Sequence, residues 1–305
     1  MFFVAKSIEK FNYYKVLDFV SLSCYWKIKY SIQVRGGYDY NVEKKSYLSD
    51  LTIEQVELFE SIFMRIEPKK VGAPLKWPLK EIINAIMYVV KSGCQWRMVP
   101  SEFPPWQTVY YHYNKWCKNG VLKTINNILA KRDRLRNGRK ATPSAGIIDS
   151  QSVKTTEVGG PKGYDAGKKV SGRKRHIVVD TEGRIISAAV HEASIQDRDG
   201  AKWVFPQMKE YPRLELIWAD GAYSGKLVSW VKENLGYNLE IVKRSSETKG
   251  FKVLPRRWVV ERTFGWFNRF RRLSKDFEYL LEVSENVMHL AMISILLRRL
   301  APAGT

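Results

Sequence analysis

The amino-acid sequence predicts an α/β sheet domain of five strands, preceded by a small all-helical domain. The prediction rests on a change of pattern along the chain. Between residues 52 and 118, apolar residues recur every three or four positions, as they do in amphipathic helices. From residue 145 onward they gather instead in short runs bounded by Gly, Asp and Ser. A hydrophobic content of 45% supplies enough apolar side chain for such cores and argues against a disordered chain.

Three helices are expected in the N-terminal part. The first begins after Thr52, which has Gln55 at the spacing of a capping box. Its apolar face is expected to contain Ile53, Val56, Phe59 and Phe63. A second amphipathic helix covers residues 82–90 and ends near Gly93. A third follows Pro105, where aromatic and basic residues alternate in the segment WQTVYYHYNKWCK.

These helices define a predicted domain of residues 47–130. Its size is that of a helix-turn-helix DNA-binding module, with a helical cap or dimerisation domain as the alternative. Residues 1–46 show no sustained period and are interpreted as an atypical leader. Residues 131–146 are first charged, then small and Pro-bearing, which is typical of a linker. The sheet domain is placed at residues 147–300.

Five short β-type runs follow the predicted linker. They cover residues 145–150, 175–180, 184–190, 214–220 and 239–242. A helical stretch, 199–209, separates the third run from the fourth, and an amphipathic helix over 284–300 ends the chain with a spacing typical of core packing. This order indicates a mixed sheet whose first three strands are connected by hairpins.

The charge balance points to a polyanionic partner. The chain has 51 Lys and Arg against 31 Asp and Glu, a formal net charge of +20. Such a surplus suits nucleic acid or an anionic membrane, with solubility alone as the plain alternative. The longest late apolar stretch, residues 286–297, is too short to span a bilayer, so nucleic acid is favoured over a membrane. Three cysteines without CxxC spacing and an N-terminus without a readable secretion signal favour a reducing, cytoplasmic setting.

Three carboxylates stand out as candidates for metal chemistry. Asp149 and Asp220 each close a predicted strand before a Ser- or Gly-bearing turn, and Glu261 is isolated among arginines. Carboxylates can hold two Mg²⁺ ions about 3.5 to 4 Å apart for phosphodiester chemistry. Each acid also has a structural interpretation, because Asp commonly forms turns and Glu261 stands four residues after Arg257. The spacing alone leaves three competitors open, Asp180, Asp197 and Asp199.

Five strings in order resemble the bacterial insertion-sequence transposases of the Asp-Asp-Glu type, in the insertion sequence five group. They are IIDSQSVK, KGYDAGKKVSGRKRHIVVDTEG, ASIQDRDGA, WADGAYSG and VVERTFGWFNRFRRLSKDFE. Upstream, SDLTIEQVELFE, INAIMYVVKSGCQWRMVP and FPPWQTVYYHYNKW resemble the helical N-terminal domain of the same group. The resemblance covers about residues 47–300. It implies a ribonuclease H-like catalytic domain in which Asp149, Asp220 and Glu261 are the catalytic, metal-binding acids, with two Mg²⁺ ions or Mn²⁺ in their place.

The resemblance also implies a function. A bacterial transposase of this kind binds the terminal inverted repeats of its element and catalyses DNA cleavage and strand transfer. Its partners would be double-stranded DNA of the transposon ends and of the target, and a second copy of itself in a homodimeric DNA complex. The protein would be cytoplasmic and nucleoid-associated when bound to DNA. Arg257 matches the arginine of the family's tyrosine-arginine-glutamate-lysine signature, whereas Leu254 and Asn268 depart from it.

Two basic segments are expected to contact DNA phosphates. The first is the GRKRH run, with Arg173, Lys174, Arg175 and His176, for which a solvated hairpin is the alternative. The second is a helix over residues 256–272, with Arg257, Arg262, Arg269, Arg271 and Arg272. Two other functions fit the same features. One is a DNA-binding protein with an inert sheet domain, and the other is a metal-dependent nuclease that does not join strands.

Overall fold

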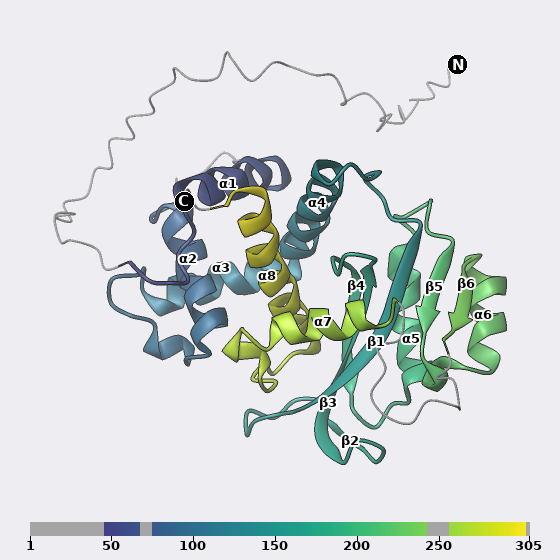
Figure 1. Ribbon diagram of the computed structural model, residues 1–305. Coiled ribbons are helices and arrows are strands. Elements are labelled where there is room, and N and C mark those ends of the chain that lie inside the picture. The colour runs from purple at the N-terminus through teal and green to yellow at the C-terminus, as the bar shows by residue number, and fades with distance from the viewer. Residues whose placement is uncertain (1–45, 68–74, 243–255, 303–305) are drawn as a thin grey trace, which may run out of the picture. The chain divides into compact units, whose positions relative to one another are not determined.

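The computed structural model describes residues 46–67, 75–242 and 256–302 (Figure 1). Its N-terminal part is helical, as predicted, with α1 (Ile53–Ile66), α2 (Leu79–Ser92), α3 (Trp106–Lys118) and α4 (Val121–Arg136), and a 3₁₀ turn at Trp96–Met98. The predicted leader lies outside the described residues except for residue 46.

Local sequence signals begin and end these helices as predicted. The Thr52 hydroxyl accepts a hydrogen bond from the Gln55 backbone N–H at 3.4 Å, which confirms the capping box of α1. Gly93 ends α2 with a φ of 73°, a conformation that favours glycine. One prediction for α1 is wrong, because Ile53 in its first turn is 66% exposed.

Helix α4 was not predicted, and it changes the interpretation of the linker. It continues to Arg136, so the first six residues of the predicted linker 131–146 are helical. The side chains of Asp133 and Arg134 in this stretch are buried. Charged residues here therefore belong to a packed helix face rather than to a solvated connection.

The second part of the chain is a mixed sheet of six strands. They are β1 (Ala145–Lys154), β2 (Gly163–Asp165), β3 (Val170–Asp180), β4 (Ile185–Glu192), β5 (Leu216–Ala219) and β6 (Asn238–Ile241). The strand order is β2-β3-β1-β5-β6, and β4 also pairs with β3. The β1/β3 and β3/β4 pairs are antiparallel, whereas β1/β5 and β5/β6 are parallel. All five predicted strands are present, and the three-residue β2 is an addition from the Gly-rich segment.

Helices cover both faces of the sheet. α5 (Asp197–Val204), the 3₁₀ turn Phe205–Met208 and α6 (Lys226–Leu235) pack on one face, and α7 (Trp258–Phe267), α8 (Leu281–Leu300) and α4 pack on the other. Two short 3₁₀ turns, Gly221–Tyr223 and Arg271–Leu273, complete the described elements. Neighbouring side chains of β1 point to opposite faces of the sheet. Ile147 belongs to the hydrophobic cluster that includes α7, and Ile148 belongs to the cluster that includes α5.

The C-terminal helix α8 is the centre of the larger core. Its residues Val287, Leu290, Ile293, Leu296 and Leu297 are buried, which confirms the predicted core packing. It contacts α4 and β4, so the helical part and the sheet share one hydrophobic cluster (Figure 1). Within the described part of the chain, no helix has the length and apolar character needed to cross a membrane.

Candidate active site

The three candidate acids come from three different elements. Asp149 lies in the middle of β1, which continues to Lys154, so the prediction that it ends its strand is wrong. Because strand residues alternate between faces, Asp149 shares the face of Ile147, on which α7 packs. Asp220 directly follows β5, as predicted, and its Oδ1 accepts a hydrogen bond from the Ala222 N–H at 2.9 Å. Glu261 lies in the first turn of α7 and is half exposed.

Arg257 connects two of these acids. Its Nη2 lies 3.6 Å from Asp220 Oδ2 and 3.7 Å from Glu261 Oε1. Arg257 immediately precedes α7, and Glu261 is four residues later on the same helical face. One guanidinium therefore faces the carboxylate at the end of β5 and the carboxylate of α7 together. The side chain is mostly buried, which strengthens this arrangement relative to a surface ion pair.

Asp149 is electrostatically coupled to the same group. Its pKa is raised to about 6, mainly by burial and in addition by the charge of Asp220. The Ser150 N–H, which donates to Asp149 Oδ1 at 2.7 Å, opposes this rise, as do the charges of Arg257 and Lys168. Asp220 is thus close enough for its charge to disfavour ionisation of Asp149, which a bound cation would relieve.

The donor set fits a hard divalent cation in its chemistry. Carboxylate oxygens are the ligands that Mg²⁺ and Mn²⁺ accept, and the buried Asp149, with its raised pKa, would gain from a cation beside it. The described residues do not form a closed metal cage, however, since no group of three His, Cys, Asp or Glu among them is close enough to hold an ion. The group that contacts both Asp220 and Glu261 in this structure is the Arg257 guanidinium.

The competing acids have other partners. Asp180 is buried and accepts hydrogen bonds from Arg134 and from Arg184 Nη1, the latter at 2.9 Å. Asp197 accepts from Ser150 Oγ at 2.9 Å and lies 3.0 Å from Lys174 Nζ. Asp199 is exposed beside Lys202. The contacts of these three acids are those of structural or surface residues.

The GRKRH run requires a correction. Arg173, Lys174, Arg175 and His176 lie on β3, and all four side chains are buried. Arg173 Nη1 lies 3.0 Å from Asp276 Oδ1, and Arg175 Nη1 donates to the Leu273 carbonyl at 2.7 Å. These partners lie about a hundred residues away in the sequence. The run is therefore an internal anchor in this structure, and its side chains do not present charge to a phosphate.

The second basic segment divides into distinct roles. Its helix, α7, ends at Phe267 and does not reach residue 272 as predicted. Arg272 is buried, with its Nε donating to Glu278 Oε1 at 2.7 Å, so it too is an anchor. Arg262 lies between two tryptophan rings, 4.4 Å from the centroid of Trp258 and 4.6 Å from that of Trp266. Arg269 and Arg271 are exposed.

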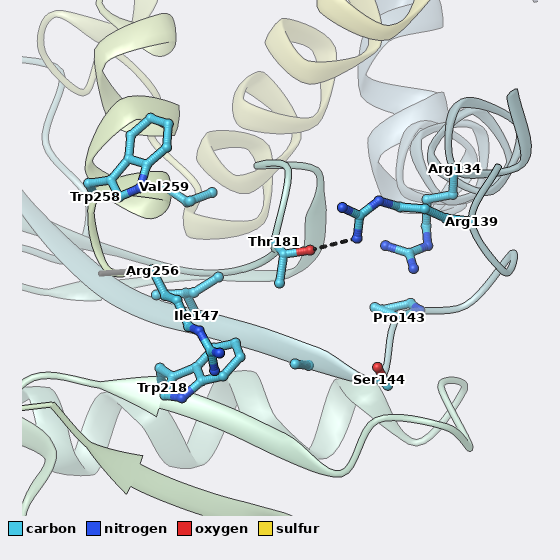
Figure 2. Close-up of a pocket in the computed structure, with 11 residues that line it drawn as sticks. Arg134, Arg139, Pro143, Ser144, Ile147, Thr181, Trp218, Arg256, Trp258 and Val259 are labelled. Carbon is cyan, nitrogen blue, oxygen red and sulfur yellow. Dashed lines mark hydrogen bonds between the residues drawn. The ribbon is translucent and has the colours of Figure 1, made fainter. Parts of the chain in front are cut away.

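A basic cavity that the sequence did not reveal is lined by residues of β1, β5 and α7, the elements that carry or precede the acids (Figure 2). It has a volume of about 500 Å³ and is lined by arginines and tryptophans from distant segments, with no carboxylate. Arg256 lies over the Trp218 ring at 4.2 Å, and Arg139 donates to Thr181 Oγ1 at 3.1 Å (Figure 2). Ile147 and Trp218 in its lining stand two residues before Asp149 and Asp220. The cavity thus places positive charge near the strand segments that lead to the two aspartates.

Lys168 is a second residue that sequence reasoning missed. Its Nζ donates to the Ser150 carbonyl at 3.1 Å, and its charge lowers the pKa of Asp149. It belongs to the Gly-rich segment before β3, where no pattern marks it as special. Its proximity to Asp149 arises from the fold and could not be inferred from spacing.

A mixed α/β sheet with helices on both faces, which carries Asp149 on its first strand, Asp220 after a later strand and Glu261 on a following helix, has a ribonuclease H-like fold. The fold class predicted from the sequence is confirmed. The chain belongs to the family described as "Transposase DDE domain", whose model matches residues 140–296. DDE transposase domains use divalent metal ions.

The helical part matches a second family model, "Putative transposase of IS4/5 family", over residues 51–126. A relative from Burkholderia cepacia, the "Putative transposase for insertion sequence element IS402", is 30% identical over 143 residues. The match covers 43% of this chain and 64% of the relative, so the chain spans just under two thirds of that protein. These similarities confirm the resemblance to insertion-sequence transposases.

Proposed function

We propose that this chain is the transposase of an insertion sequence of the IS4/5 type. It binds the terminal inverted repeats of the element and catalyses metal-dependent cleavage and strand transfer into target DNA. The observation that carries the proposal is the placement of Asp149, Asp220 and Glu261 on one side of the sheet. Asp220 and Glu261 both face Arg257, and Asp220 raises the pKa of Asp149.

The three acids would hold two Mg²⁺ ions, or Mn²⁺ in their place. Such ions supply activation of the attacking oxygen and stabilise the leaving oxygen. The chain's own contribution is to position these groups. Arg257 holds Asp220 and Glu261 toward each other, and Lys168 and the arginines of the adjoining cavity favour a phosphodiester beside the acids.

The surplus of positive charge supports DNA as the substrate. A net charge of +20 steers a polyanion toward the protein and yields affinity through counterion release. Two ends of one element must be brought together for transposition. We therefore expect two copies of the chain in the DNA complex.

The proposal is tested with Asp220→Asn in an end-cleavage assay with Mg²⁺. Loss of one charged ligand should lower the cleavage rate by about 10²-fold or more, while duplex binding is retained. Asp199→Asn is the matched control, because Asp199 is an exposed aspartate whose carboxylate pairs with Lys202. Wild-type cleavage by the Asp220 variant would overturn the assignment of the acids.

A strand-transfer assay distinguishes the transposase from the two alternatives. Joined products between element ends and target DNA are the expected result. Cuts without joining would identify a nuclease, and retention of DNA without cuts would identify a DNA-binding protein with an inert sheet domain.

A further inference from the structure

A second basic cavity is lined by residues of α2, of α7 and the turn after it, and of α8, with no carboxylate in its lining. Its volume is about 320 Å³. Four of the residues that line it are basic and none is acidic. The basic residues are Lys91 of α2, Arg269 just after α7, and Arg298 and Arg299 of α8. The cavity therefore combines charges from the helical part and from the helices on the sheet.

The positive charge of this cavity is largely unbalanced. Of the four cations, Arg299 has a carboxylate partner, Asp133 Oδ2 at 3.3 Å. Among the residues that the structure describes, Lys91, Arg269 and Arg298 form no salt bridge. Arg298 Nη2 instead donates to the Leu48 carbonyl at 3.4 Å. Like charges held together without a counter-ion repel one another, so an anion bound among them would stabilise the arrangement.

The surroundings and the lowered pKa of Lys91 are consistent with this repulsion. Its Nζ lies 4.6 Å from the centroid of the Phe270 ring. Burial lowers its pKa, and the charges of Arg298 and Arg269 lower it further. The three cations are thus close enough to sense one another.

Packing, rather than opposite charge, holds Arg269 in this position. Arg272 Nη1 donates to the Cys94 carbonyl at 3.1 Å and so fixes the turn after α7 to the end of α2. Gly93 permits the close approach, since a Cβ at this position would lie 2.9 Å from Arg271 Cβ. The fold therefore brings Arg269 to Lys91 before any ligand is present, which lowers the entropic cost of binding one.

The cavity adjoins a second hollow along α7. It shares Trp266 and Arg299 with this hollow of about 440 Å³, which Arg136, Arg262, Asp133 and Glu182 also line. Arg299 lies 4.9 Å from the centroid of the Trp266 ring, and Arg262 lies 4.6 Å from the same centroid. Trp266 is five residues after Glu261 on α7, about 7 Å along the helix axis, or roughly two nucleotide steps of a duplex.

We propose that Lys91, Arg269 and Arg298 form a binding pocket for a backbone phosphate of DNA, a few nucleotides from the phosphate that is cut. The ligand is a phosphodiester of the duplex, recognised by charge and without regard to base sequence. The inference rests on the proposed function, because it takes DNA as the substrate. It adds a contact that joins α2 of the helical part to the two helices beside the acids, so that one duplex lies across both.

The test compares full-length Arg269→Ala/Arg298→Ala with the wild type in duplex binding over a series of salt concentrations. We expect affinity to fall about tenfold or more at low salt. The plot of log affinity against log salt should become less steep by about 1, as one lost phosphate contact requires. Lys202→Ala/Lys232→Ala removes the same charge from exposed positions on α5 and α6 and should stay within about twofold of the wild type.

Further measurements separate the explanations. Arg269→Lys/Arg298→Lys keeps the charge and should retain most of the affinity, which distinguishes a lost contact from a folding defect. The loss should be equal for terminal-repeat and unrelated duplexes; a loss confined to the repeat would overturn a backbone contact. Thermal stabilisation by inorganic phosphate alone that equals stabilisation by duplex would overturn the assignment to DNA.

The outcome for the wild type distinguishes this inference from the proposed function. If the wild type binds and cuts DNA but the double alanine variant keeps its affinity and salt slope, the pocket is refuted and the transposase proposal stands. If the wild type neither binds nor cuts DNA, the proposed function itself fails.

Discussion

Two buried histidines, His176 and His191, pack close to the strand that carries Asp149. His191 Nε2 lies 3.2 Å from His176 Nδ1, and burial lowers the pKa of both rings. Gly200 leaves the space for them, because a Cβ there would lie 2.2 Å from His191 Nε2 and 2.4 Å from His176 Cε1. His176 Nε2 lies 3.5 Å from Asp197, which also accepts from the residue next to Asp149. The packing of the histidine pair therefore supports the strand that carries the first acid.

Gly200→Ala should destabilise the protein by about 1–3 kcal/mol, since the added methyl group must displace a buried ring. Gly265→Ala is the matched control, because nothing lies within 4 Å of a Cβ at that position of α7. There the change should be neutral or stabilise by about 0.5–1 kcal/mol through reduced backbone entropy of the unfolded chain. Urea unfolding measures both. Equal effects of the two substitutions would contradict the steric argument.

A titrating carboxyl group of α8 gives a prediction with a defined sign. Burial raises the pKa of Glu285 to about 7, and its Oε1 accepts the Val190 N–H at 3.0 Å. The folded state therefore holds this proton more tightly than the unfolded state, whose Glu pKa is near 4.5. Between about pH 4.5 and 7 the unfolded chain releases this proton while the folded protein still holds it, so stability falls as pH rises.

Glu285→Gln removes this titration and keeps the acceptor oxygen. The variant should match the wild type near pH 4.5 and exceed its stability at pH 8 by on the order of 2 kcal/mol. Urea midpoints measured across this pH range test the prediction. An advantage that is constant with pH, or larger in acid, would show that the group does not titrate as its burial implies.

At the scale of elements, sequence patterns predicted what depends on near neighbours. The Thr52 cap, the end of α2 at Gly93 and the short apolar run at the start of β1 all follow from residues a few positions apart. Helix α4 and the burial of the β3 side chains could not be predicted in this way. The charged side chains of Arg134 and Arg173 were expected to be exposed to solvent, because their partners Asp180 and Asp276 are distant in the sequence.

For the candidate active site, too, the sequence predicted local features but not contacts between distant residues. Candidate acids could be found at predicted strand ends, but only the resemblance to transposases selected Asp149, Asp220 and Glu261 among their competitors. The contacts of Arg257 with two of them, and the nearness of Lys168 to Asp149, required the fold.

Asp180→Ala tests the ion pairs that connect α4 to the β3–β4 hairpin. Asp180 accepts from Arg134 of α4 and from Arg184, which directly precedes β4, so its removal leaves two buried guanidinium groups without this partner. Breaking such a pair should cost about 3–5 kcal/mol of unfolding free energy. Asp199→Ala, at an exposed position, should change stability by less than about 0.5 kcal/mol. Urea unfolding compares the two, and a loss as small as that of the control would show that the network adds little.

For the whole molecule, the shared core bears on the predicted division at residues 131–146. Phe59 of α1, Ile147 of β1 and Val260 of α7 belong to one hydrophobic cluster with α8. The described residues, from 46 onward, likewise form one compact unit. A helical part and a sheet that share buried side chains stabilise each other, so we expect them to fold together rather than as independent domains.

Leu290→Ala measures this dependence, because Leu290 is fully buried at the centre of α8. The cavity left behind should lower the unfolding free energy by about 2–5 kcal/mol, and it should lower the hydrogen-exchange protection of α2 and of β1 amides equally. Leu135→Ala is the control, since the same truncation on the exposed side of α4 removes little packing. If β1 kept its protection while α2 lost it, the two parts would unfold separately, and the division predicted from the sequence would describe real folding units. An equal loss of protection in α2 and β1 would instead mean that α8 joins the helical part and the sheet into one cooperative structure. Such cooperativity is what we expect if one DNA duplex lies across both parts, from Lys91 to the three acids.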